Sequence, residues 1–375
     1  MHPRVTGWAK LPLHYGRMPS WLFAKMRQLG EKISEIIVDE FGTKTFLRRL
    51  ASPYWFQALG CVLGFDWHSS GLTTTVLGAL REAFEKAGLE IRIAGGKGKK
   101  SLKAPEEIEK IGDTFNFTSK LISKLVYSSK IIAKVDNAVL QDAYHLYHHC
   151  FILDKKGNWV VVQQGMNCFD KTARRYHWLW ETTTSFVEDP GRQSMSDKKL
   201  FKVLNMSSKI SKANQKICLD LAKQPLPNLK FDLERAKPKW LKFISEIKKA
   251  TRGAEKSSEL EILELPKNLN WDSLKKAYEL QPKNYEELIA IQGIGPAAVR
   301  ALALISKLIY GTPIDWKDPV AYSFAHGGKD GVPYPVDRKT YQTSIDMLKV
   351  AIDNAKIGER DKIGALKRLS VYFKI

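Results

Sequence analysis

The sequence is poor in cysteine and has no long apolar run. It contains 4 cysteines and no C-x-x-C pair, which excludes a zinc ribbon and provides no disulfide framework. Charged residues or histidine interrupt every hydrophobic stretch before it reaches the roughly 18 apolar residues of a membrane helix. Residues 1–8 also lack the basic and apolar regions of a signal peptide. These absences predict a cytoplasmic protein whose free thiols lie in its core.

Acidic residues are scarce relative to basic ones. The 60 Lys plus Arg outnumber the 40 Asp plus Glu and leave a formal net charge of +20. Such an excess predicts a polyanionic partner, with nucleic acid as the first candidate and an anionic membrane surface or a ribosome-like environment as alternatives. Because the sequence shows no lipidation motif and no amphipathic membrane helix, we expect nucleic acid, duplex or structured.

The apolar residues that are present suffice for a substantial core. At roughly 100–200 residues per domain, a chain of 375 residues that is 44% hydrophobic predicts about two or three domains. Helical patterns cover 21–41, 43–50, 73–87 and 118–149, the last interrupted at 126–136, and strand patterns cover 90–94, 150–154 and 159–163. Lysine-rich helices dominate after residue 190. We therefore predict an α+β, predominantly helical protein, with a mixed α/β domain over 1–190 and an all-helical domain over 200–375.

A glycine-containing turn separates two helical patterns in the second predicted domain. The first helix begins near Asn284 and ends at Gly293, and proline suits the first turn of the second. The two glycines let the backbone approach a ligand, Ile294 fills the space between the helices, and amides at the second helix's N-terminus face a phosphate oxygen. The predicted contacts are Gly293, Ile294, Gly295, Pro296 and Arg300. The element over 284–307 predicts binding that does not depend on sequence, with an ordinary helix pair as the alternative.

This turn resembles the helix-hairpin-helix element of the DNA glycosylase superfamily. The superfamily carries a downstream aspartate that stabilises positive charge on the sugar or activates the attacking group, and the matching residue is Asp337. The gap from Gly295 to Asp337 is longer than usual, and Ala297 stands where bifunctional members carry a lysine that forms a Schiff base. The resemblance implies base excision without lyase chemistry from that lysine. Capping of a helix over 339–355 is the alternative role of Asp337.

Polar residues that suit catalysis concentrate at two places before residue 190. The candidate catalytic residues there are Asp66, His68, Asp136 and Asp142. The spacing of Asp142, His145 and His149 places them on one face of a predicted helix and permits a metal site. Magnesium or manganese bound there would orient water against a phosphodiester, as in nucleases. A polar helix face that caps the neighbouring strands is the alternative.

Residues 154–158 predict a tight turn that joins the strands 150–154 and 159–163 in a β-hairpin. Basic residues lie next to aromatic ones after the second of these strands. The candidate nucleic-acid contacts there are Arg174, Arg175, Tyr176 and Trp178, because arginine pairs with phosphate and aromatic rings stack on bases. A buried aromatic core with two surface arginines is the alternative. Lys97 and Lys99 add positive charge in a basic loop over 95–101. That loop lacks the Walker spacing, so we do not infer a nucleoside triphosphatase.

Several longer blocks resemble the signature of one family. These blocks are 11–16, 60–71, 94–99, 163–167, 174–178 and 324–331. They are similar to a largely archaeal family catalogued as domain of unknown function 763, and the resemblance covers nearly the whole chain. It implies an archaeal cytoplasmic protein and supplies no reaction.

Together these features predict a DNA-binding protein of DNA repair or processing. As an enzyme it would excise a base with Asp337 or cleave a phosphodiester with a metal held by the acidic and histidine residues. The alternative is a non-catalytic module that binds nucleic acid and recruits other repair factors.

Overall fold

The computed structural model describes residues 18–65, 70–169, 171–196, 199–250, 263–320, 338–354 and 358–373. Its helices are α1 (Ser20–Ala51), α2 (Pro53–Val62), α3 (Gly71–Lys86), η1 (Gly98–Lys103), α4 (Ala104–Thr114), α5 (Ser119–Lys134), η2 (Val135–Val139), η3 (Lys209–Ser211), α6 (Lys212–Ala222), α7 (Leu226–Ala250), α9 (Trp271–Leu280), α10 (Tyr285–Ala290), α11 (Pro296–Tyr310), α12 (Arg338–Asn354) and α13 (Glu359–Phe373). Its strands are β1 (Ile91–Lys97), β2 (Leu140–Gln141), β3 (His145–Asp154), β4 (Trp159–Asn167), β5 (Thr172–Leu179), β6 (Gln193–Ser196) and β7 (Leu204–Asn205). The predicted α+β, predominantly helical class is confirmed.

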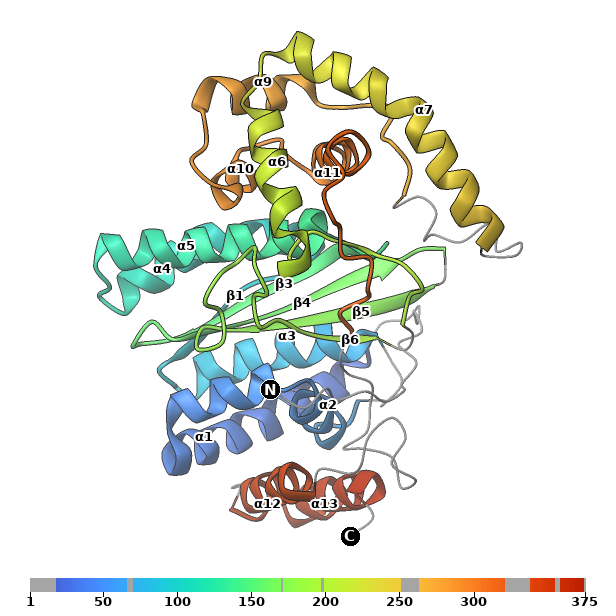
Figure 1. Ribbon diagram of the computed structural model, residues 1–375. Coiled ribbons are helices and arrows are strands. Elements are labelled where there is room, and N and C mark those ends of the chain that lie inside the picture. The colour runs from blue at the N-terminus through green and yellow to red at the C-terminus, as the bar shows by residue number, and fades with distance from the viewer. Residues whose placement is uncertain are drawn as a thin grey trace.

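An antiparallel sheet with the strand order β1-β3-β4-β5-β6 lies in the middle of the molecule (Figure 1). The predicted turn between β3 and β4 is present. The Asp154 carboxylate accepts hydrogen bonds there from the backbone N–H groups of Lys156 and Asn158. A second, two-stranded sheet pairs β2 with β7.

Helices cover both faces of the large sheet. On one, called here the α3 face, side chains such as Ile152 and Val162 join the core formed with α1, α2 and α3. On the other, called the α5 face, Phe151 and Val161 join the core formed with α4, α5, α6 and α11. Neighbouring strand residues point to opposite faces, so β3 and β4 are apolar on both sides.

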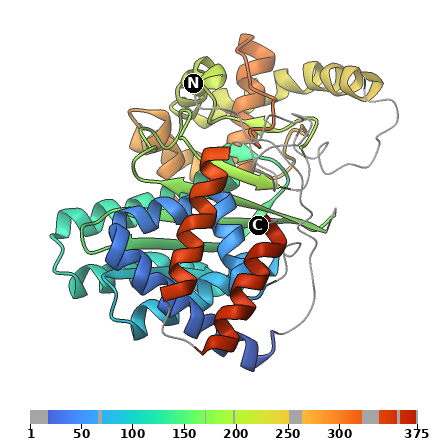
Figure 2. The ribbon, with the colours of Figure 1, turned by 90° about the horizontal axis from the view of Figure 1, so that it is seen from below.

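The last two helices lie on the α3 side of the molecule. Buried residues of α12 and α13, among them Leu348, Ile352 and Ala365, belong to the same core as α1 and α2 (Figure 2). The guanidinium of Arg368 donates to the carbonyl of Val62 at the end of α2, at 2.8 and 3.0 Å. The predicted helical domain over 200–375 is thus divided between the two sides of the sheet.

The chain does not leave the sheet at the predicted boundary near residues 190–200. Strand β6 pairs with β5 through Arg175 and Met195, and Tyr176 lies opposite Ser194. The following segment returns along the α5 face, where Asn205 bridges to Asp315. The composition thus changes after residue 190 while the sheet continues through β6.

The structure confirms the helices predicted over 21–41 and 43–50 and corrects the one predicted over 118–149. Gly42, the predicted end of the first helix, interrupts α1 with φ 78° and ψ 159°, a conformation that favours glycine. Helix α5 runs through the predicted interruption at 126–136, and residues 145–149, predicted as helical, begin strand β3. That strand is covered on both faces, so its sequence lacks the polar–apolar alternation typical of a half-exposed strand. Among the described residues, no helix combines the length and apolar character needed to cross a bilayer.

Candidate functional site

Helices α10 and α11 form the hairpin that the sequence predicts. Asn284 caps α10 by accepting from the backbone N–H of Glu287 at 2.8 Å, and the Glu287 carboxylate accepts from the N–H of Lys283. Helix α11 begins at Pro296, and Ile294 in the turn is buried in the core of the α5 face with 2% of its surface exposed. The local helix signals at Asn284 and Pro296 therefore mark the starts of the two helices correctly.

The two glycines of the hairpin turn have different structural roles. Gly293 has φ 92°, and a Cβ atom built there would lie 2.8 Å from the Cβ of Ser273. Gly295 has an extended backbone with φ −128°, and a Cβ there would approach nothing closer than 4.0 Å. Folding therefore requires glycine at 293 but not at 295. A side chain added at Gly295 occupies open space at the first turn of α11.

The first turn of α11 offers backbone donors. In the described part of the chain, no hydrogen bond uses the N–H groups of Gly295, Ala297 or Ala298, whereas Val299 donates back to the Gly295 carbonyl at 3.0 Å. These N–H groups belong to the positive end of a helix of 15 residues. The turn can therefore donate to an anionic oxygen without breaking an existing hydrogen bond.

Two side chains fasten this hairpin to the α5 side of the sheet. The Lys134 ammonium donates to the carbonyls of Ile289 and Ile291 at 2.7 and 2.5 Å, at the end of α10. The Gln141 amide donates to the Pro296 carbonyl at 2.8 Å and accepts from Arg300 at 3.1 Å. Arg300 is therefore engaged beside the turn, half-buried and oriented by Gln141. Burial lowers the pKa of Lys134 to about 8.

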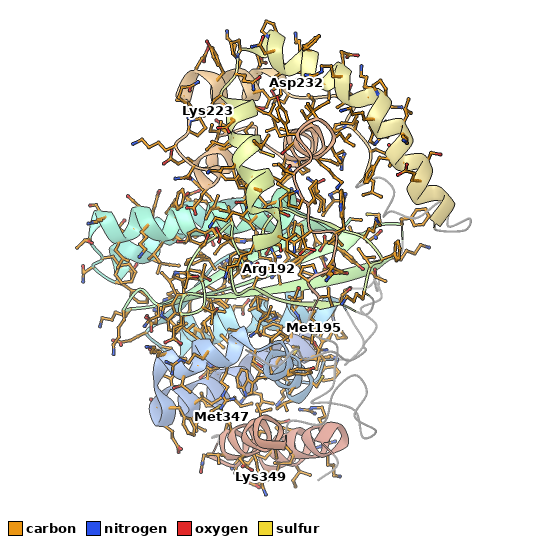
Figure 3. The ribbon with its side chains drawn as sticks, viewed as in Figure 1. Arg192, Met195, Lys223, Asp232, Met347 and Lys349 are labelled. Carbon is orange, nitrogen blue, oxygen red and sulfur yellow. The ribbon has the colours of Figure 1, made fainter. Side chains whose placement is uncertain are left out.

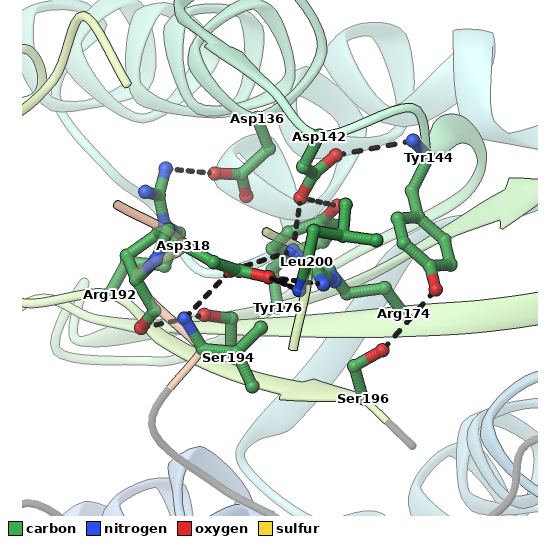
Figure 4. A network of polar contacts seen from close by, with 12 residues as sticks. Asp136, Asp142, Tyr144, Arg174, Tyr176, Arg192, Ser194, Ser196, Leu200 and Asp318 are labelled. Carbon is green, nitrogen blue, oxygen red and sulfur yellow. Dashed lines mark hydrogen bonds and ion pairs between the residues drawn. The ribbon is translucent and has the colours of Figure 1, made fainter. Parts of the chain in front are cut away.

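Asp136 lies inside the protein and not at an open site. Its carboxylate accepts hydrogen bonds from Gln163 and Trp178, each at 2.6 Å. It also accepts one from Arg192 at 2.6 Å (Figure 4). Burial raises the pKa of Asp136, and Arg192 opposes that shift by attraction. Both carboxylate oxygens are used, so the predicted catalytic role of Asp136 lacks an accessible oxygen. The carboxylate instead joins η2 to strands β4 and β5 and to Arg192, the residue before β6.

Asp142 and Arg174 form a second buried ion pair on the α5 face. Arg174 donates to Asp142 at 2.9 Å and to both carboxylate oxygens of Asp318 at 2.9 and 3.0 Å. Tyr176 donates its hydroxyl to Asp142 at 2.8 Å. Burial raises the pKa of Asp142, and Arg174 opposes that shift. Asp142, predicted to be catalytic, is thus paired with Arg174, which was predicted to contact phosphate.

The predicted metal ligands do not come together. His145 is exposed at the start of β3, and four residues along a strand separate two side chains by about 13 Å, against about 6 Å along a helix. His149 is buried, with its ring nitrogens 2.8 Å from Ser129 Oγ and 2.6 Å from Gln163 Oε1. Burial lowers its pKa to about 4. The described residues contain no group of three or more His, Cys, Asp or Glu placed to hold a metal ion.

The predicted aromatic and basic contacts of β5 are interior residues. Arg174, Arg175 and Tyr176 have 0% of their surface exposed, and so has Trp178. They cannot stack on bases or pair with phosphates at the surface, so this prediction of a binding surface is corrected. The pattern arises because β5 is the fourth strand of a sheet covered on both faces.

The remaining predicted residues lie elsewhere. Lys97, at the end of β1, and Lys99, in η1, are exposed, as a phosphate contact requires. Asp66, His68 and Asp337 fall outside the described residues.

Comparison with protein families gives one match. A family model described as "Protein of unknown function (DUF763)" matches residues 7–336. The chain belongs to the DUF763 family. No curated protein and no solved structure matches it. The family match includes both ion-pair networks, the hairpin and Asp318, so these features lie within the part of the chain that defines the family.

The residues that hold the site in place carry no pattern in the sequence of this DUF763 chain. Lys134 and Gln141 reach the hairpin across 155 sequence positions, and Asp318 reaches Arg174 across 144. Arg192 was also missed. An isolated lysine or aspartate has no spacing pattern, so only the fold reveals these partners.

Proposed function

We propose that this protein binds nucleic acid through its phosphate backbone, with the α10–α11 hairpin as the primary contact, and that it acts in DNA repair or processing. The observation that carries the proposal is the first turn of α11, where the N–H groups of Gly295, Ala297 and Ala298 have no acceptor among the described residues. A phosphate oxygen fits such a helix end in charge and in hydrogen bonding. The net charge of +20 supports the same partner.

The mechanism of binding follows from the turn geometry. The extended backbone at Gly295 leaves space for a phosphate to approach the first turn. Pro296 has no N–H to satisfy, and its carbonyl is fixed by Gln141, so the turn is ordered before binding. Such contacts recognise the backbone and carry no base information. Lys97 and Lys99 would add attraction that salt screens.

The contacts of Asp136, Asp142 and His149 favour backbone binding over metal-dependent cleavage at these residues, because their polar atoms already serve the core. Base excision through Asp337 remains a prediction. Comparing labelled strands incubated in magnesium or manganese with strands incubated in chelator, before and after alkali, distinguishes the two chemistries. Alkali-revealed breaks in chelator indicate base excision. The cytoplasm is the compartment that we propose.

Gly295→Asp tests the proposal with a matched control. Aspartate is a favoured residue before a helix, so the variant should fold as well as the wild type while placing a negative charge where the phosphate would bind. Gly295→Ser makes a similar cap without charge. We expect duplexes of unrelated sequence to lose roughly tenfold in affinity with the aspartate and little with serine, measured by fluorescence anisotropy. Equal affinity of all three folded proteins would reject the hairpin as the contact.

A further inference from the structure

Arg175 is a buried cation on the α3 face of β5. It has 0% of its surface exposed, and its guanidinium lies 4.7 Å from the ring centre of Phe56. Its Nη2 donates to Gln57 Oε1 at 2.6 Å and contacts Met195 Sδ at 2.8 Å. The titratable group that raises the pKa of Arg175 is the thiol of Cys61, which is not a carboxylate. Burial has the larger effect and lowers the pKa of Arg175 to about 9. The charge is therefore desolvated, and no carboxylate in the described part of the chain pairs with it.

Several buried polar atoms around Arg175 also lack partners. In the described part of the chain, Nε and Nη1 of Arg175, Nε2 of His177 and Oε1 of Gln193 have no hydrogen-bond partner. These residues lie on the same face, because His177 is two positions from Arg175 on β5 and Gln193 lies opposite His177. His177 Nδ1 lies 2.9 Å from the Leu50 carbonyl, to which it donates, so Nε2 carries the lone pair. The two orphaned nitrogens of Arg175 are donors, whereas His177 Nε2 and Gln193 Oε1 are acceptors. Leaving buried donors unsatisfied is costly, so the guanidinium of Arg175 is the group that calls for an acceptor.

Met195 occupies the position where an anion would be expected. A thioether sulfur is a weak acceptor, and the methionine side chain turns easily about three bonds. Met195 lies on β6, the last strand of the sheet, so Arg175 is one strand from the sheet edge (Figure 3). Rotation of the buried Met195 side chain away from the guanidinium frees Nη2, beside the unpartnered Nη1, for a stronger acceptor.

We propose that Arg175 binds an oxyanion, carried by a phosphate or a carboxylate group, in place of the Met195 thioether. One oxygen accepts from Nη2 and another from Nη1, the arrangement in which guanidinium groups hold such anions. Gln57 stays bound and orients the guanidinium. This site lies on the face of the sheet away from the hairpin, and it goes beyond the proposed backbone binding.

Thermal unfolding in chloride buffer, with chloride replaced by inorganic phosphate at constant ionic strength, tests the site. Phosphate stabilises many proteins without binding them, so Arg175→Met provides the reference in the same buffers. We expect the wild-type midpoint to rise by a few degrees in a saturable way, and the variant to rise only gradually. In Met195→Ala, the midpoint should reach half of its rise at a lower phosphate concentration than in the wild type, because no side chain must move aside.

Two further sets of measurements identify the source of the oxyanion. Acetate replaces phosphate in one set. The other compares a short single-stranded oligonucleotide carrying a 5′-phosphate with the same oligonucleotide lacking it. A saturable wild-type rise with acetate indicates a carboxylate ligand, and a rise specific to the 5′-phosphate indicates a strand end. Gly295→Asp should keep the response to inorganic phosphate, so loss of hairpin binding and loss of this site can be told apart.

Equal phosphate responses of the wild type and Arg175→Met would overturn the proposal. So would a midpoint of Arg175→Met several degrees below the wild type in chloride, because that loss would show that the guanidinium is already satisfied. If Arg175→Met does not fold, the comparison of Met195→Ala with the wild type decides, and equal half-saturation concentrations or the absence of saturation reject the site.

Discussion

Arg174 and Arg175 are neighbours on one strand but belong to different faces of the sheet. On the α5 face, Arg174 meets two carboxylates, Asp142 and Asp318, within 3.0 Å. On the α3 face, Arg175 meets an amide oxygen and a thioether sulfur. Both are fully buried, so the difference lies in their partners and not in their exposure. The comparison teaches that carboxylates match the guanidinium on the α5 face, whereas no carboxylate of the described residues matches the guanidinium on the α3 face.

The largest expected effect comes from Arg174→Met, which removes the cation of the ion-pair network on the α5 face. The variant leaves Asp142 and Asp318 buried and close together without a counter-charge. We expect the free energy of unfolding to fall by about 3–5 kcal/mol, the usual cost of removing one partner of a buried pair. Urea unfolding at neutral pH measures it. A loss below about 1 kcal/mol, the scale of an exposed pair, would show that this network is not a structural centre.

Lys134 sharpens the comparison because it is a partly buried cation held by carbonyls. Its pKa is lowered to about 8 by burial, so the folded protein disfavours its charged form. Its contribution to stability is therefore lowest below pH 8 and rises as the pH increases toward the unfolded pKa of about 10.4. We expect the free energy of unfolding of the wild type to rise by about 1–2 kcal/mol relative to that of Lys134→Met between pH 7.5 and 10, after discounting for partial exposure. Parallel pH profiles would show that Lys134 is not desolvated.

Asp318→Asn removes one of the two negative charges that contact Arg174 on the α5 face. Asp142 and Arg174 remain as a one-to-one pair, and asparagine retains an acceptor for Arg174. We therefore expect a loss of about 1 kcal/mol, the scale of one hydrogen bond, well below that of Arg174→Met. Chemical unfolding of both variants under the same conditions checks the ratio. Equal losses would mean that Asp318 rather than Asp142 neutralises the arginine.

Arg175→Met should have the smallest effect on stability and the opposite sign. Replacing an unpaired buried charge with an apolar side chain of similar length removes a desolvation cost, and such replacements are often neutral or stabilising. We expect a change between zero and about 1 kcal/mol of added stability in chloride buffer. The same unfolding series provides the measurement. A marked loss would make the two faces alike and remove the contrast between them.

Much of the fold follows from local sequence signals. Gly42 and the Asn284 cap mark helix ends that the structure confirms, and Pro296 marks the start of α11. The start of strand β3 was missed because residues 145–149 show no clear strand period. The packing of α12 against α1 depends on contacts far apart in the chain, which no local pattern contains.

The candidate sites were predictable to different degrees. The hairpin turn could be located from the sequence, whereas its anchors Lys134 and Gln141 could not. Adjacent residues of a strand point to opposite faces, so the sequence could have separated Arg174 from Arg175 once β5 was assigned as a strand. It could not show that Asp318 pairs with one arginine, because that contact requires the folded chain.

The most direct test of the account is the salt dependence of duplex affinity for the wild type, Gly295→Asp and Gly295→Ser. Each phosphate contact contributes about one unit to the slope of log affinity against log salt. We predict a steep wild-type slope that is kept by the serine variant and reduced by about one unit in the aspartate variant, at unchanged stability. Three identical slopes, or no salt dependence, would contradict phosphate binding at the α11 turn.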